Sequence, residues 1–233
     1  MKLTIKTLVL STTTFGLMWG VAQNAQAAIV PNVTASLTGL TTDPGAPWNL
    51  QNTVNGQGLP GNVPSLTGLH TPSNFISTAW RSDTLSNTTG TTISGANITF
   101  NLNGTYKIYG GTFWNFGGYL EAEAQQGIKD VAFEYSSDGG TNWQALSGAP
   151  TQFAQGAYSN DLSNLSYQSP QSFSFNPVTA THVRFTNLSN WGSPINQIGF
   201  NEVQFSAAPI PEPSSLLALL VFGLAGVSLG KRI

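Results

Sequence analysis

The chain has 233 residues, of which only 8 are Lys or Arg and 10 are Asp or Glu, and it contains no cysteine. A chain so poor in basic groups argues against nucleic-acid binding, because affinity for nucleic acid depends on neutralising phosphates. The absence of cysteine excludes disulfide bonds, thiolate zinc sites, iron–sulfur clusters and thiol nucleophiles. The folded part must therefore be held by its hydrophobic core, alone or with a bound ion.

The first 27 residues have the features of a secretory signal peptide. Lys2 and Lys6 are the only charges in this stretch, and a mostly apolar run follows at residues 8–21. Ala25-Gln26-Ala27 satisfies the small-x-small rule, which predicts cleavage by signal peptidase after Ala27. We therefore expect the protein to be exported.

Residues 28–207 are expected to form one all-β domain, an antiparallel β-sandwich of the jelly-roll type with seven or eight short strands. Apolar and polar residues alternate along several stretches, as they do in half-buried strands. The clearest of these stretches are 98–102, 131–135, 183–186 and 198–205. No convincing amphipathic helix is present in this region.

Turn signals separate the expected strands. Asn103-Gly104 predicts a turn between strands at 98–102 and 105–115, and Gly110-Gly111 predicts a bulge in the second of them. Asp138-Gly139-Gly140 predicts a hairpin turn that leads into a strand at 143–146. Residues 41–69 are rich in Gly, Pro and Asn and are expected to form a long surface loop.

The last residues combine three signals in a fixed order. Pro211-Glu212-Pro213 is followed by an uncharged apolar stretch at residues 214–230 and then by Lys231 and Arg232. Seventeen helical residues would reach about 25 Å, a little less than the ~30 Å hydrocarbon core. The positive-inside rule predicts that Lys231 and Arg232 stay in the cytoplasm. An ordinary C-terminal anchor is the alternative interpretation.

This tail, residues 208–233, resembles the PEP-CTERM sorting signal of Gram-negative bacteria and cyanobacteria. The resemblance implies that the membrane enzyme exosortase cuts near Pro211-Glu212-Pro213 and releases or transfers the exported protein. The precursor would then be anchored in the inner membrane by the 214–230 helix, and the product would reach the cell surface or the extracellular matrix. The basic end is shorter than is usual in the family.

The domain itself is similar to the discoidin or coagulation-factor C-type domain. The matching stretches are Thr78-Ala79-Trp80-Arg81-Ser82, then residues 131–143, then residues 177–205 with Phe200-Asn201-Glu202-Val203-Gln204-Phe205 at the end. The resemblance implies a galactose-binding-like jelly roll, often with carbohydrate or lipid-headgroup binding at the loops of one end. The cysteine pair of many members is absent, and the ligand loops are not recognisable, so the ligand does not follow from the fold.

A calcium ion is a further implication of this resemblance. In related jelly rolls a Glu at the position of Glu202 helps to hold a structural Ca²⁺, together with backbone carbonyl groups of an early loop. Hard oxygen ligands suit this ion.

No catalytic constellation stands out. His70 and His182 are the only histidines, and structural roles are favoured for both. Glu121 and Glu123 could be the two carboxylates of a glycosidase, but a solvated strand edge is the preferred interpretation. Arg81 and Arg184 are expected to form structural ion pairs with Glu202, Glu134 or Asp83.

The tryptophans carry the binding hypothesis, because the C–H face of a sugar packs on aromatic rings. Trp48, in the long loop, is the best candidate, with Phe75 and Tyr158 behind it. The sequence therefore predicts a non-catalytic module that binds extracellular polysaccharide. A secreted glycan hydrolase or lyase is the main alternative, and a purely structural surface protein without a small ligand is another.

Overall fold

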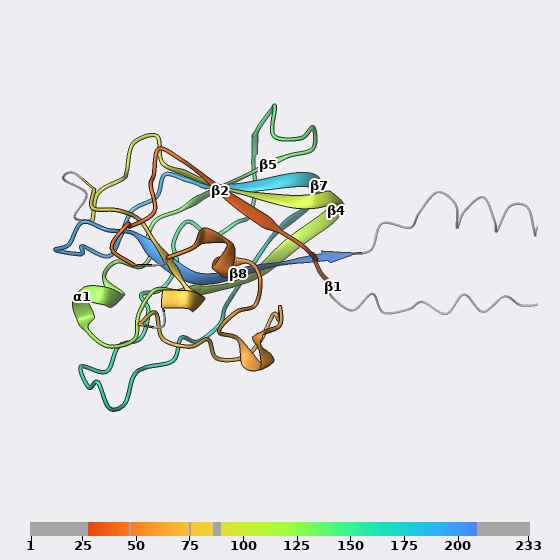
Figure 1. Ribbon diagram of the computed structural model, residues 1–233. Coiled ribbons are helices and arrows are strands. Elements are labelled where there is room, and N and C mark those ends of the chain that lie inside the picture. The colour runs from red at the N-terminus through yellow and green to blue at the C-terminus, as the bar shows by residue number, and fades with distance from the viewer. Residues whose placement is uncertain (1–27, 47, 75, 86–89, 209–233) are drawn as a thin grey trace, which may run out of the picture.

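The computed structural model describes residues 28–208, apart from residues 47, 75 and 86–89, and shows an all-β antiparallel domain (Figure 1). Its strands are β1 (Ala28–Ile29), β2 (Thr34–Thr38), β3 (Trp80–Arg81), β4 (Asn97–Asn115), β5 (Ala132–Ser136), β6 (Gln144–Ala145), β7 (Gln171–Thr186) and β8 (Gly199–Ala208). The short helices are the 3-10 helices η1 (Leu50–Thr53), η2 (Pro60–Asn62) and η3 (Ile76–Thr78) and the α-helix α1 (Glu121–Ala124).

The strands form one hydrogen-bonded network that curls over on itself. The order β1-β8-β4-β7-β5-β6 is continuous, while β2 pairs with β4 and β3 pairs with β8. The first part of β4 lies between β2 and β7, whereas its second part lies between β8 and the start of β7. β4 and β7 therefore run through both halves of the fold and join them.

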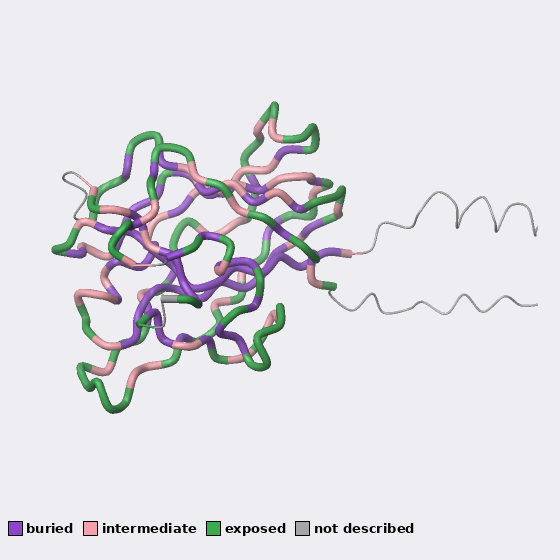
Figure 2. Tube along the Cα trace, in the orientation of Figure 1, coloured by how far each residue is buried: buried purple, intermediate pink, exposed green. Residues whose placement is uncertain are grey.

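Aromatic rings from the two halves meet between them. Phe100 contacts Phe205 with ring centres 5.4 Å apart, and Phe113 contacts Phe185 at 6.3 Å. All four side chains are fully buried. Figure 2 shows buried chain through the middle of the domain and mostly exposed chain in the outer loops. Such aromatic contacts bury large apolar areas, which a domain without disulfides needs.

Two predicted turns have different outcomes. Asp138-Gly139-Gly140 does form the turn between β5 and β6, as predicted. Asn103-Gly104 does not reverse the chain, so this prediction was wrong: β4 continues through it with only a shift in its register against β7 between Asn101 and Tyr106. The bulge predicted at Gly110-Gly111 is confirmed, since the register shifts between Ile108 and Gly110 against both neighbouring strands.

Two further predictions of local structure were wrong. The strands expected around residues 173–175 and 183–186 are one strand, β7, and Glu121 and Glu123 lie on the short helix α1 instead of a strand edge. Within the expected loop at 41–69, residues of η1 and η2 form short helical turns.

The two ends of the domain lie together. Ala28 of β1 pairs with Ala207 of β8, and α1 lies at the opposite end of the molecule (Figure 1). The predicted signal peptide and the sorting tail with its 214–230 helix lie outside the described residues. Among the residues described, no helix is long and apolar enough to cross a membrane.

Candidate functional site

A pocket of about 140 Å³ lies where several loops converge near α1. Its lining comes from separate parts of the chain: Trp48, Ser73, Asn74, Arg81, Phe116 and Glu123. Arg81 belongs to β3 and Glu123 to α1, while the other four lie in loops. The pocket combines two aromatic rings with a guanidinium, a carboxylate, an amide and a hydroxyl group.

Arg81 is fixed in this pocket by Asp43. Its Nε and Nη2 atoms both lie 2.7 Å from the same carboxylate oxygen, Oδ2. The backbone N–H of Gly45 and the side-chain amide of Gln197 also donate to Asp43. Burial alone would raise the pKa of Asp43, but the Gly45 N–H and the Arg81 guanidinium outweigh it and hold the pKa below the ordinary value of 3.8. Arg81 is therefore a fixed, charged group beside the pocket.

Trp48 forms a wall of the pocket. Its ring centre lies 4.7 Å from the guanidinium carbon of Arg81 and 5.8 Å from the ring centre of Phe116. Only 9% of the residue is exposed, and its indole N–H has no hydrogen-bond partner among the described atoms. The predicted binding residue thus lies in the pocket wall, packed between Arg81 and Phe116.

Glu123 and Asn74 supply polar groups to the same pocket. The amide nitrogen of Asn74 lies 3.2 Å from each carboxylate oxygen of Glu123. The backbone N–H groups of Tyr119 and Leu120 donate to Oε2 of the same carboxylate. Glu123 is thereby held in one orientation, with its acceptor oxygens at the pocket.

Ser73 connects the pocket to β8 through hydrogen bonds. Its hydroxyl donates to Oδ1 of Asn201 at 2.6 Å and accepts the N–H of Gly117 at 2.8 Å. Asn201 in turn contacts the buried ring of His70, whose Nδ1 lies 2.8 Å from the carbonyl oxygen of Thr71. Burial lowers the pKa of His70, so the imidazole is neutral in this network.

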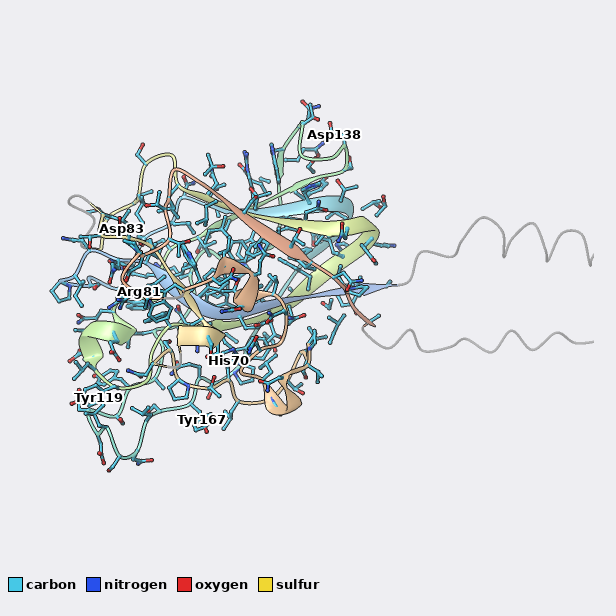
Figure 3. The ribbon with its side chains drawn as sticks, viewed as in Figure 1. His70, Arg81, Asp83, Tyr119, Asp138 and Tyr167 are labelled. Carbon is cyan, nitrogen blue, oxygen red and sulfur yellow. The ribbon has the colours of Figure 1, made fainter. Side chains whose placement is uncertain are left out.

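The other two predicted binding residues have different positions. Tyr158 is 37% exposed and bridges to Gly118, two residues beyond Phe116, so it lies on a loop adjoining the pocket. Phe75 lies outside the described residues, although its neighbour Asn74 lines the pocket. Figure 3 shows Arg81 and Tyr119 near α1, with Tyr167 on a neighbouring loop.

The two expected ion pairs are resolved differently. Arg184 pairs with Glu134, one of its predicted partners. Arg81 pairs with Asp43, so the partners predicted for it were wrong. No local pattern points to Asp43, because the pair joins a loop residue to a strand 38 positions away.

Glu202 occupies a separate buried site under η1 and the loop that follows it. The residue is fully buried, and its Oε1 accepts the N–H of Gly56 and the side-chain amide of Gln204. The same Gln204 amide donates to the carbonyl oxygen of Val54. Oε2 has no hydrogen-bond partner among the described atoms. Burial raises the pKa of Glu202 well above its ordinary value, and its two hydrogen bonds offset this only in part.

The oxygen ligands around Glu202 suit a calcium ion. Buried carboxylate oxygens normally have a hydrogen-bond or metal partner, and Oε2 of Glu202 has neither among the described atoms. The carboxylate lies beside a loop whose backbone carbonyl groups could also bind Ca²⁺. Within the described part of the chain, no cluster of three or more His, Cys, Asp or Glu side chains forms a metal site. A bound Ca²⁺ would therefore rely on Glu202 and on carbonyl oxygens such as that of Val54.

Comparison with known proteins identifies the tail. Residues 209–232 match the PEP-CTERM protein-sorting motif, so the predicted sorting motif is confirmed. No curated protein matches the chain.

Several solved structures are similar to the domain. One is CpGH89CBM32-5 from Clostridium perfringens, in complex with GalNAc-β-1,3-galactose, at 17% identity and a TM-score of 0.44 over 78% of this chain and 100% of that one. Another is CBM32-3 from a family 31 glycoside hydrolase of the same organism, at 17% identity and a TM-score of 0.46 over 78% and 94%. A third is the C-terminal domain of a chitobiase from Bacteroides fragilis, at 16% identity and a TM-score of 0.44 over 79% and 100%. The ligand must be argued from this chain's own residues.

Proposed function

We propose that this protein is exported through its signal peptide, processed by exosortase at Pro211-Glu212-Pro213, and acts at the cell surface or in the extracellular matrix as a non-catalytic carbohydrate-binding module. The sorting motif at residues 209–232 supports the route of export. The precursor would be held in the inner membrane by the 214–230 helix, with Lys231 and Arg232 as its cytoplasmic stop. In this proposal residues 28–207 form a galactose-binding-like jelly roll.

The observation that carries the binding function is the composition of the Trp48 pocket. Sugars offer apolar C–H faces and hydroxyl groups that both donate and accept hydrogen bonds. The pocket offers aromatic walls from Trp48 and Phe116, a donor from Arg81 and an acceptor from Glu123. Concave sites with apolar walls and a few fixed polar groups are typical of small-ligand binding.

The groups of the pocket are already oriented, which favours binding. Arg81 is held by Asp43, and Glu123 by Asn74 and two backbone N–H groups. Asp43 takes Nε and Nη2 of Arg81, which leaves Nη1 to donate to a ligand hydroxyl. Preorganised groups lose little conformational entropy when a ligand binds. Tyr158, on the adjoining loop, and Phe75 would extend the contact to a longer glycan.

A catalytic role is not proposed for this pocket. A glycosidase needs a pair of carboxyl groups that flank the scissile bond. Among the described residues Glu123 is the one acid that lines the pocket, and three donors hold its carboxylate through four hydrogen bonds. Glu121, also on α1, is exposed and does not line the pocket.

A structural calcium ion at Glu202 is part of the same proposal. The ion would neutralise the buried carboxylate and tie the loop after η1 to β8. Its contribution would be stability in a domain without disulfide bonds.

A glycan array followed by a panel of chromogenic sugars tests the function. We expect the wild-type protein to bind one or more glycans without turnover. Asn74→Ala, a change of an exposed side chain, should weaken this binding about tenfold, because the Glu123 carboxylate loses its anchor. Asn176→Ala, at an exposed position on β7, is the matched control and should bind as the wild type does. Turnover of a chromogenic sugar would reject the proposal in favour of an enzyme.

A further inference from the structure

The solvent-facing side of β2, β4, β7 and β5 forms a regular polar surface, called the outer face below. Cross-strand partners in antiparallel strands point to the same side of a sheet. The register places Ser36 opposite Thr99, Thr99 opposite Arg184, and Arg184 opposite Glu134. These four side chains therefore form one row across four strands, about 14 Å long at ~4.8 Å per strand spacing.

A second row runs parallel to the first. Thr34, Asn101 and His182 are paired in the same way on β2, β4 and β7. Their neighbours along each strand, such as Phe100 and Val183, point into the core. The outer face is thus built from hydroxyl, amide and imidazole groups at regular spacings.

The hydroxyl groups of the outer face are available. Within the described residues, the side chains of Thr34, Ser36 and Thr99 form no hydrogen bond, and Thr34 and Ser36 are exposed. Many polar side chains of the loops are engaged in internal hydrogen bonds, as Ser73 and Asp138 are. The outer face can therefore donate and accept hydrogen bonds without first breaking internal ones.

Trp143 adds an aromatic ring to one border of this surface. The guanidinium carbon of Arg184 lies 4.2 Å from its ring centre, and His182 meets it edge-on with ring centres 6.4 Å apart. Its indole N–H donates to the carbonyl oxygen of Gly140, in the turn between β5 and β6. The ring is only partly buried.

The turn that carries Trp143 is itself held firmly. The carboxylate of Asp138 accepts hydrogen bonds from the N–H groups of Thr141 and Asn142 and from the hydroxyl of Ser136. These bonds hold the pKa of Asp138 far below its ordinary value. Figure 3 shows Asp138 on this projecting turn, well away from Arg81. Trp143 is thus positioned before any ligand arrives.

The surface carries almost no net charge. Arg184 is paired with Glu134, and partial burial lowers the pKa of His182, so this ring is neutral at pH 7. A neutral face matches a neutral ligand, whereas an anionic polymer would meet a cation already paired with a carboxylate. The face also lacks the apolar centre that a stable protein–protein contact would bury.

We propose that the outer face is a second binding site, separate from the Trp48 pocket, for an extended neutral polysaccharide chain. One sugar would pack on Trp143, and the following part of the chain would exchange hydrogen bonds with Thr99 and Ser36 across the strands. A row of this length suits several linked sugars, whereas the pocket has a volume of only about 140 Å³. The site does not depend on the function proposed for the pocket.

Retention on insoluble polymers tests this site. The full chain, solubilised in mild detergent, is mixed with microcrystalline cellulose or chitin, which are neutral, or with alginate gel, which is acidic. We expect retention on at least one neutral polymer and none on alginate. The double variant Thr99→Val with Ser36→Ala removes two hydroxyl groups and keeps side chains that strands accept, so about tenfold weaker retention is expected.

Matched variants separate this site from the pocket and from a folding defect. Thr179→Val, an exposed hydroxyl further along β7, should leave polymer retention unchanged, and the double variant should keep the array-glycan binding assigned to the Trp48 pocket. Trp143→Ala should reduce retention at least as much as the double variant, and its thermal unfolding shows whether it is folded. Retention of the double variant at the wild-type level would overturn the proposal, as would absence of wild-type retention on both neutral polymers.

Discussion

The guanidinium of Arg81 lies over the ring of Trp48, with its carbon 4.7 Å from the ring centre. The same arrangement recurs at Lys129 over Trp191 and at Arg184 over Trp143. Of the four basic side chains in the described residues, only Lys107 has no such ring contact. This charge-poor domain therefore places most of its cations on tryptophan rings, two of which belong to the proposed binding surfaces.

Arg81→Lys should lower the free energy of unfolding by about 1–2 kcal/mol, because a lysine cannot donate from two nitrogens to Asp43 while stacking on Trp48. Urea unfolding measures this. Lys107→Met, at an exposed position on β4, is the control and should change stability by less than about 0.5 kcal/mol. Equal stability of Arg81→Lys and the wild type would show that the stacked pair does not hold the pocket wall.

Low pH should reduce the stability that the Asp43–Arg81 ion pair contributes to the pocket wall. The folded-state pKa of Asp43 lies below its ordinary value of 3.8, so its contribution to stability is complete above that pH and is lost as the pH falls through the folded-state pKa. Asp43→Asn should therefore be less stable than the wild type at pH 6, and the difference should shrink toward pH 2. The measurement is chemical unfolding of both proteins across this range. A constant difference at all pH values would contradict the assignment.

Calcium should stabilise the protein through Glu202. If millimolar Ca²⁺ is about 100 times its dissociation constant, the free energy of unfolding rises by about 2.7 kcal/mol. The melting temperature should then rise by roughly 5–10 °C. Glu202→Gln should abolish this rise, and without calcium it should be at least as stable as the wild type, because it removes a buried charge.

Glu121→Gln, an exposed change on α1, is the control for calcium and should keep the full rise in melting temperature. A wild-type melting temperature that does not move at millimolar Ca²⁺ would reject the ion site.

The backbone at Asn103 explains why the strand continues through a turn signal. Asn103 has a φ of 55°, and its side-chain amide donates to the carbonyl oxygen of Asn32. Asn103→Val should lower stability by about 1–2 kcal/mol, since a β-branched residue disfavours this conformation, whereas Asn103→Gly should stay within about 0.5 kcal/mol. Equal unfolding curves for the Val and Gly variants would show that the conformation is unstrained.

The strand content of the fold follows from local patterns, but its continuity does not. Alternation at residues 98–102 and 183–186 correctly marks strands, and Asp138-Gly139-Gly140 correctly marks a hairpin turn. An Asn-Gly pair has the same local preference for positive φ in a hairpin and in a strand irregularity. Only the pairing of β4 with β7 on both sides of Asn103 decides between them, and that pairing joins distant segments.

The candidate pocket was predictable only in part. Trp48 could be selected because it is an aromatic residue in a long polar loop. Asn74, Phe116 and Glu123 could not, since they come from separate segments and share no spacing. Glu123 does sit three residues after the residue that precedes α1, as in a capping box, but that residue is Leu120, so the usual Ser or Thr signal is absent.

The central claim, that a sugar occupies the Trp48 pocket, is tested most directly by the indole N–H signals of the tryptophans in a ¹⁵N-resolved NMR titration with a glycan identified on the array. The Trp48 signal should shift and saturate with the glycan concentration, because Trp48 lines the pocket and its indole N–H has no hydrogen-bond partner among the described atoms. The signal of Trp114, which is buried and donates to the carbonyl oxygen of Gly68, should stay in place. Saturable binding that leaves the Trp48 signal unmoved would contradict the claim.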